Sequence, residues 1–138
     1  MNILIIDGQG GGVGRQLVEN IKKSFPGQTV TAVGTNALAA QAMLKAGADR
    51  AATGENAVIV ACRTADIIVG PIGIAIADSL WGEITPEMAL AVGQSTATRI
   101  LLPMNLCHNY IAGMDRIHTS AILEDCMEKI REILSQKP

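Results

Sequence analysis

Residues 2–14 read NILIIDGQGGGVG, and the fold can be worked out from them outward. Their apolar run, Ile3–Ile6, predicts a buried strand, because it is short, rich in β-branched residues and followed by turn residues. Glycines crowd the next positions, and a helical pattern begins at Val13. Glycine lets a backbone pass close to a ligand, and the amino end of a helix offers free N–H groups and a partial positive charge. The stretch therefore predicts a strand, a turn and a helix that form a nucleotide or anion site.

Length and composition indicate one α/β domain over residues 1–138. Of these residues, 49% are hydrophobic but only 2% are aromatic, so the core must consist of Ala, Val, Ile, Leu and Met. Layered folds with parallel strands often have such cores. A chain of this length forms one compact domain with an ample core.

Charge and hydropathy exclude several classes of partner. The formal net charge of −2 and the scarcity of aromatic residues leave neither a basic stripe nor stacking rings for nucleic acid. Apolar residues are frequent over 66–80, but Gly70 and Pro71 interrupt them before the roughly 20 residues that a membrane span needs. The amino end lacks the layout of a secretory signal. We therefore expect a cytoplasmic protein with no nucleic-acid or membrane partner.

Strand-like and helix-like segments alternate along the chain. Apolar and β-branched runs predict strands over 2–7, 29–33, 48–53, 66–69 and 99–102. Helical spacing and capping residues predict helices over 13–25, 37–45 and 86–92, and a last one capped by Thr119 or Ser120. Segment 55–62 is either a helix or a buried strand, and the type of 74–80 is open, because a continuous apolar run fits both.

This alternation predicts a Rossmann-like fold with three layers and a mainly parallel sheet of about five strands. Ligands of such sheets bind beyond the carboxyl ends of the strands. Small and polar residues gather in the turns at that edge. The candidate binding residues are Gly8, Gln9, Gly10, Gly11, Gly12, Val13, Gly14, Thr35, Asn36, Glu55, Asn56, Gly70 and Gly73.

Each of these candidates has a structural alternative. The glycine turn can be a packing device that lets the first helix approach the sheet, and Asn36 can be a simple helix cap. Gly70 and Gly73 can belong to an ordinary turn rather than to a second wall of the pocket.

The glycine spacing departs from two common phosphate motifs. A Gly-x-Gly-x-x-Gly motif that starts at Gly8 fails at Val13, and a P-loop fails at Arg15 and Gln16, where Lys and Ser or Thr would stand. Residues 7–14 instead resemble the Thr-Gly-x-x-x-Gly-x-Gly turn of short-chain dehydrogenases, with Asp7 in place of the threonine.

Dehydrogenase chemistry does not follow from that resemblance. The family's Tyr-x-x-x-Lys pair is absent, because Met114 stands four residues after Tyr110. No acid follows the second strand to hold a ribose, since residues 34–36 read Gly-Thr-Asn. NAD(P) therefore stays one candidate beside a mononucleotide, a coenzyme A fragment or another phosphorylated metabolite.

Two carboxylates are candidates for general acid–base catalysis. Asp7 ends the first strand and Glu55 follows a polar turn at the same edge. Each has a structural alternative, since Asp7 can bond turn N–H groups and Glu55 can be a first-turn helix acid. Whether the protein is an enzyme is therefore open.

Cysteine and histidine residues indicate neither a metal site nor a thiol nucleophile. Cys62, Cys107 and Cys126 are far apart and form no Cys-x-x-Cys pair, so we expect buried free thiols. Adjacent residues such as Cys107 and His108 generally point apart, and no acid is spaced to orient His108 or His118.

Two further segments indicate a surface role. The helix over 37–45 is apolar nearly all round, with only Gln41 and Lys45 polar, so it is buried under other elements or at an interface. This favours a homo-oligomer, by default a two-fold dimer, and an alternative role as a structural or regulatory subunit. Asp78 and Glu83 flank Trp81 and Gly82, which form either a mobile lid or a solvated connection.

Five segments together resemble a small, uncharacterised bacterial family, a domain of unknown function. They are IIDGQGGGVG at 5–14, AVGTN at 32–36, ATGENA at 52–57, GPIGI at 70–74 and GEITP at 82–86. The resemblance covers nearly the whole chain. It implies a Rossmann-like protein with a glycine-rich amino-terminal turn and brings no known activity with it.

Overall fold

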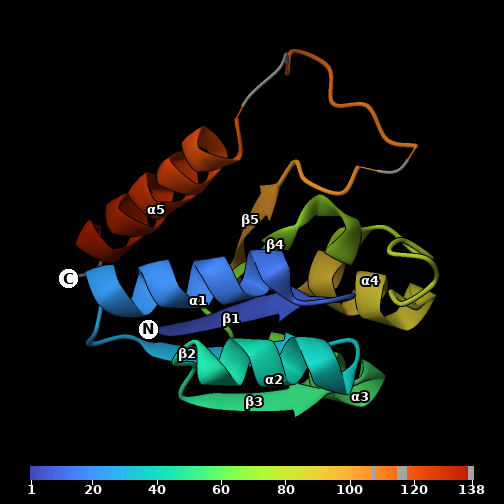
Figure 1. The fold of residues 1–138 in the computed structure, drawn as a ribbon, viewed down its shortest axis with the longest axis horizontal. Helices are drawn as coiled ribbons and strands as arrows, with labels where there is room; N and C mark the ends of the chain where they lie inside the picture. Colours follow the sequence, from blue (N-terminus) through green and yellow to red (C-terminus); the bar gives the residue numbers. More distant parts are fainter. Residues whose placement is uncertain (107, 115–117, 137–138) are drawn as a thin grey trace.

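The computed structural model describes residues 1–106, 108–114 and 118–136, which build one parallel sheet with helices on both faces (Figure 1). The sheet has the strand order β3-β2-β1-β4-β5. The strands are β1 (Asn2–Asp7), β2 (Thr29–Gly34), β3 (Arg50–Thr53), β4 (Ile67–Pro71) and β5 (Thr98–Leu102). The strand order reverses between β1 and β4, which is where ligands of open α/β sheets bind.

The helices form two layers, one on each face of the sheet. The first layer packs into one buried cluster and contains α1 (Gly12–Ser24), α2 (Ala37–Lys45) and α5 (Thr119–Ser135). The second layer packs into another cluster and contains α3 (Glu55–Cys62), the short 3-10 helix η1 (Ile72–Ala75) and α4 (Pro86–Gln94). The expected Rossmann-like, three-layer fold with five parallel strands is confirmed.

The central strand β1 explains how one short stretch organises both layers. Ile3 and Ile5 belong to the cluster under α1, whereas Leu4 and Ile6 belong to the cluster under α4. All four side chains are fully buried. Successive side chains of a strand point to opposite faces, so a continuous apolar run is what a strand covered on both sides requires.

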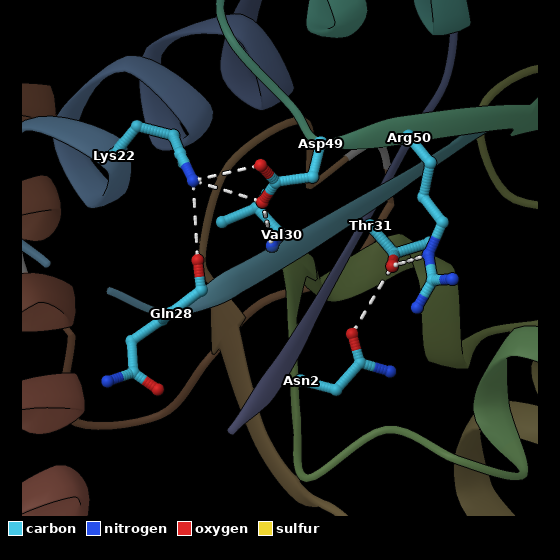
Figure 2. A network of polar contacts seen from close by, with 7 residues as sticks. All are labelled: Asn2, Lys22, Gln28, Val30, Thr31, Asp49 and Arg50. Atoms are coloured by element: carbon cyan, nitrogen blue, oxygen red, sulfur yellow. Dashed lines mark hydrogen bonds and ion pairs between the residues drawn. The ribbon is translucent and has the colours of Figure 1, made fainter. Parts of the chain in front are cut away.

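The amino edge of the sheet is closed by polar contacts between α1 and the chain around β2 and β3 (Figure 2). Lys22 Nζ donates to both carboxylate oxygens of Asp49, at 3.1 and 3.0 Å, and to the carbonyl of Gln28 at 3.3 Å. Asp49 also accepts the Val30 N–H at 2.7 Å. The hydrogen bond from the Val30 N–H lowers the pKa of Asp49 most, and the hydrogen bond from Lys22 lowers it further. These contacts tie the start of β3 to the end of α1.

A second set of contacts at this edge runs across three strands (Figure 2). The hydroxyl of Thr31 donates to Asn2 Oδ1 at 3.2 Å and accepts from Arg50 Nε at 2.9 Å. Because Asn2, Thr31 and Arg50 lie on β1, β2 and β3, the chain of bonds holds the three strands in register.

Several element predictions are settled by the structure. Segment 55–62 is a helix, and 74–80 contains the end of η1 followed by turns rather than a regular element. The prediction that Thr119 or Ser120 caps the last helix is wrong, because the cap position is His118 and its side chain makes no capping bond. Across the described ranges, every helix is too short or too polar to cross a bilayer.

Candidate functional site

The glycine turn between β1 and α1 is built around the buried carboxylate of Asp7. Its two oxygens accept the N–H groups of Gly8 at 2.8 Å and Gly14 at 2.7 Å. Burial raises the pKa of Asp7, and the two N–H donors only partly oppose that effect. With 3% of its surface exposed, Asp7 stabilises the turn and does not face solvent.

Three of the turn's glycines are required by packing. A Cβ on Gly8 would lie 2.6 Å from Thr35 Oγ1 and 3.0 Å from Leu80 Cδ1. A Cβ on Gly11 would lie 2.8 Å from the Ala39 backbone, and Gly11 has a φ of 74° that side chains disfavour. A Cβ on Gly14 would lie 2.5 Å from the sulfur of Met43 and 2.9 Å from Asp7. Gly11 and Gly14 let α1 lie close to α2 and β1, as the packing alternative predicts.

The other two positions on the turn's outer side are not explained by packing. A Cβ on Gly10 or Gly12 would meet no atom within 4 Å. The N–H groups of Gly12 and Val13 at the start of α1 have no acceptor among the described residues, and α1 has no side-chain cap. This half of the turn therefore presents open backbone donors beyond the end of β1.

An acid that the sequence analysis did not assign to the site lies at the end of β2. Glu83, from the loop between η1 and α4, places one carboxylate oxygen 2.6 Å from Thr35 Oγ1, 2.8 Å from Asn36 Nδ2 and 2.9 Å from the Gln9 N–H. Burial works to raise the pKa of Glu83, but the three donors outweigh it and lower the pKa. Its other oxygen has no hydrogen-bond partner among the described residues.

Glu83 changes how Thr35 and Asn36 are understood. Their donor groups bind this carboxylate, so they line the site through Glu83 rather than as free donors. Asn36 also caps α2, since its Oδ1 accepts the Ala39 N–H at 2.8 Å, and its amide donates to the Gln9 carbonyl at 2.9 Å. No acid follows β2 in sequence, yet the fold supplies one there.

Glu55 and Asn56 lie on the first turn of α3, and both are exposed. The Glu55 carboxylate accepts the hydroxyl of Thr85, which in turn caps α4 by accepting the Met88 N–H at 3.2 Å. Glu55 therefore connects the starts of α3 and α4. No described contact joins it to the glycine turn.

Gly70 and Gly73 do not form an open second wall. Gly70 is buried within β4, and a Cβ there would lie 2.4 Å from the carbonyl oxygen of Ile6 on β1. Gly73 is buried in η1, where a Cβ would lie 3.1 Å from Ser79. Gly70 is thus needed for close approach of β1 and β4, which is the structural alternative for this glycine.

The thiols are placed as buried side chains. Burial raises the pKa of Cys62 to about 11 and, with help from Asp125, that of Cys126 to about 12, so neither is a ready nucleophile. Cys107 lies outside the described residues, and with it the Cys107–His108 pair. Within the described ranges, no three His, Cys, Asp or Glu side chains gather as a metal site.

A cavity that no sequence motif indicated lies between β5 and α5. It has a volume of about 600 Å³ and apolar walls that include Ile100, Ile122 and Cys126. In the sequence, only Ile122, Cys126, Ile130 and Leu134 point to this region, because they form an apolar stripe along the last helix, and such a stripe equally predicts core packing.

A protein-family model matches residues 2–135 of the chain. The chain belongs to the family described as a domain of unknown function, DUF3842. The DUF3842 match includes β1, the glycine turn and the Glu83 loop, and the resemblance found in the sequence is confirmed. No curated protein matches the chain at a significant level.

A solved structure similar to this DUF3842 chain is that of a dodecameric FMN-dependent UbiX-like decarboxylase from Escherichia coli O157:H7. The two share 14% sequence identity with a TM-score of 0.48, over 100% of this chain and 96% of the other. A similarity at this level assigns no activity.

Proposed function

We propose that the protein binds a nucleotide or another phosphorylated small molecule at the amino end of α1. The observation that carries the proposal is that the N–H groups of Gly12 and Val13 have no acceptor among the described residues. They follow the carboxyl end of β1, beside the reversal of strand order where ligands of open sheets bind. A phosphate there would gain backbone hydrogen bonds and the favourable end of the helix dipole.

The charge distribution around the turn orients such a ligand. Glu83 holds a negative charge against Gln9 and Thr35, so an anion is repelled from the β2 side and favoured on the α1 side. The free oxygen of Glu83 is an acceptor for a hydroxyl group, as the acid beyond the second strand is in dinucleotide sites. NAD(P) and mononucleotides therefore both remain candidate ligands.

Thermal unfolding with a ligand panel tests the proposal. The panel contains NAD, NADP, ATP, S-adenosylmethionine, coenzyme A and sugar phosphates. A ligand present at about 100 times its dissociation constant adds roughly 2.7 kcal/mol, which raises the unfolding midpoint by about 5–10 °C in a domain of this size. The absence of any shift across the panel would overturn the proposal.

A pair of glycine variants tests whether a ligand found in this panel binds at the glycine turn. Gly12→Val fills open space above the free N–H groups, so it should abolish ligand binding without unfolding the protein. Gly27→Val is the matched control, because Gly27 lies in the turn after the other end of α1 and also has open space around it. Equal affinity in both variants would place the ligand elsewhere.

A second role, as an oligomeric structural or regulatory subunit, is favoured by the outer face of α2. Ala39, Ala40 and Met43 are buried, but Leu38 is 66% exposed and Leu44 is 49% exposed. Burial of both leucines at a two-fold interface would account for them. Sedimentation velocity at micromolar concentration should then show a dimer that Leu38→Ser with Leu44→Ser dissociates, and a wild-type monomer would remove this role.

Acid–base catalysis has less support from the geometry. Asp7 is buried with both oxygens bonded, and the described contacts join Glu55 to Thr85 rather than to the glycine turn. If a substrate is found, Glu55→Ala should leave its turnover unchanged, whereas Asp7→Ala should act only through the shape of the turn and raise KM rather than lower kcat.

A further inference from the structure

We propose that a second cavity, beside the loop 76–84, binds a planar heteroaromatic ring that stacks on Trp81. The cavity has a volume of about 540 Å³, within the range of small-molecule pockets. Residues 76–81 line it on one side, and His108 and Asn109 complete it. It follows the carboxyl end of β4 through η1, so it belongs to the same edge of the sheet as the glycine turn.

Trp81 is the feature that identifies the ligand class. It is the chain's one tryptophan, and 93% of its surface is exposed although it lines a cavity. An indole face in this position offers a large apolar stacking surface to a flat ring. The ring of a nucleobase has that shape.

The loop that carries Trp81 is firmly built. Leu80 and Ile84 on either side are buried, and the Asp78 N–H donates to the Ile84 carbonyl at 2.7 Å. The Ile84 N–H donates back to Ser79 at 3.1 Å. The indole is therefore attached to a fixed backbone, which lowers the entropy lost when a ring stacks on it.

The backbone of this loop adopts a conformation that side chains disfavour. Leu80 and Trp81 have φ values of 56° and 57°, in the left-handed region, and Asp78 has 65°. Such conformations persist where the surroundings impose them, and they cluster at ligand-binding sites. Here they bring Trp81 out to the cavity while Leu80 stays in the core.

Two polar side chains that line the cavity, Asn109 and Asp78, can accept hydrogen bonds from the N–H groups of a ring. The amide nitrogen of Asn109 donates to the Leu106 carbonyl at 2.9 Å, which leaves its oxygen as an acceptor. Asp78 adds an exposed carboxylate. Amino-substituted bases, such as adenine, offer donors that match these two acceptors.

This cavity borders the glycine turn but does not depend on the phosphate proposal. Leu80 lines the cavity, and its Cδ1 lies 3.0 Å from where a Cβ on Gly8 would be. A ring can therefore be tested alone or attached to a phosphate.

The fluorescence of Trp81 provides a direct test, because no other tryptophan contributes. We expect adenosine and AMP to change the emission of the wild-type protein in a saturable way, and ribose 5-phosphate, which has no ring, to leave it unchanged. Trp81→Ala should weaken AMP binding, measured by calorimetry, by about tenfold. Tyr110→Ala is the matched control, since Tyr110 is 84% exposed but does not line the cavity, and it should leave AMP binding unchanged.

The outcomes separate the two proposals. If AMP and ribose 5-phosphate bind with equal affinity and Trp81→Ala changes neither, the ring site is overturned and the phosphate site stands. If adenosine alters the emission but no phosphate compound outperforms it, the ring site stands and the phosphate site fails. The emission of Trp81 could also shift to shorter wavelength as the protein concentration rises, with no effect of adenosine. That result would overturn the ring site, because it would show that a second copy of the chain covers Trp81.

Discussion

The two edges of the sheet differ in how their polar groups are bonded and in their backbone conformations. At the amino edge, Lys22 and Asp49 bind each other and nearby backbone groups (Figure 2). At the carboxyl edge, the N–H groups of Gly12 and Val13 and one oxygen of Glu83 lack partners among the described residues. One edge therefore uses its polar groups to hold strands together, while the other keeps some of them available.

Backbone conformation shows the same contrast. Among the described residues, five other than glycine have positive φ, namely Gln9, Asp78, Leu80, Trp81 and Asn105, and all lie in segments that follow carboxyl ends of strands. In the connections at the amino edge, the one residue with a positive φ is a glycine, Gly47. Disfavoured conformations cost stability and persist where function requires them. This contrast agrees with our proposal that the ligand binds at the carboxyl edge, while the amino edge holds the strands together.

The largest loss of stability should come from a side chain placed at Gly14, which has no room for a Cβ. Gly14→Val would push a branched side chain into Met43 and Asp7, and we expect the free energy of unfolding to fall by about 3 kcal/mol. Gly12→Val, two residues earlier and facing open space, should change it by less than about 0.5 kcal/mol. Urea denaturation measures both, and equal losses would show that the two halves of the turn do not differ.

A smaller difference in stability is expected between variants of Asp7 and Asp49, which accept backbone N–H groups at the carboxyl and amino edges. Asp7→Asn turns one acceptor into a donor facing the buried N–H of Gly8 or Gly14, which should cost about 1–3 kcal/mol. Asp49→Asn keeps an acceptor for Val30 and weakens only a partly exposed pair with Lys22, which should cost about 1 kcal/mol or less. A greater loss from Asp49→Asn in urea denaturation would reverse the comparison.

The smallest effect at neutral pH should come from Glu83→Gln, because glutamine keeps an acceptor oxygen for the same donors. The difference should appear with acid. Since the folded state lowers the pKa of Glu83, its carboxylate adds stability above the usual value of about 4.3, and that contribution is lost as pH falls through the folded pKa.

The unfolding free energy of the wild type, relative to Glu83→Gln, should thus decrease between about pH 5 and pH 3. Denaturation series at several pH values, with Trp81 emission as a probe of the loop, measure this. A difference that stays constant with pH would mean that the three donors do not hold Glu83 in solution.

Much of the fold could be predicted because its signals are local. The bounds of α2 at 37–45 and the Asn36 cap depend on residues within one turn of each other. The last helix shows the limit, since Thr119 and Ser120 are good capping residues by type, yet the helix starts with His118 at the cap position. Composition alone also could not tell which side chains of the apolar helix α2 stay exposed.

The candidate site was harder to predict, because identical residues have different roles there. Gly11 and Gly14 are needed for packing, whereas Gly10 and Gly12 are not, and nothing in a run of glycines distinguishes them. The difference arises from Ala39 and Met43 on another helix.

The parallel three-layer sheet and the glycine turn after β1 follow from the sequence, because hydrophobic pattern and backbone preference act over neighbouring residues. The position of Glu83 at the end of β2, 48 residues from Thr35 in the chain, follows only from the packing of the sheet. The packing likewise decides that Trp81 stays exposed beside a cavity. The reason is physical: a hydrogen bond or a cavity wall depends on which distant segments the packed sheet brings together, and no local pattern contains that information.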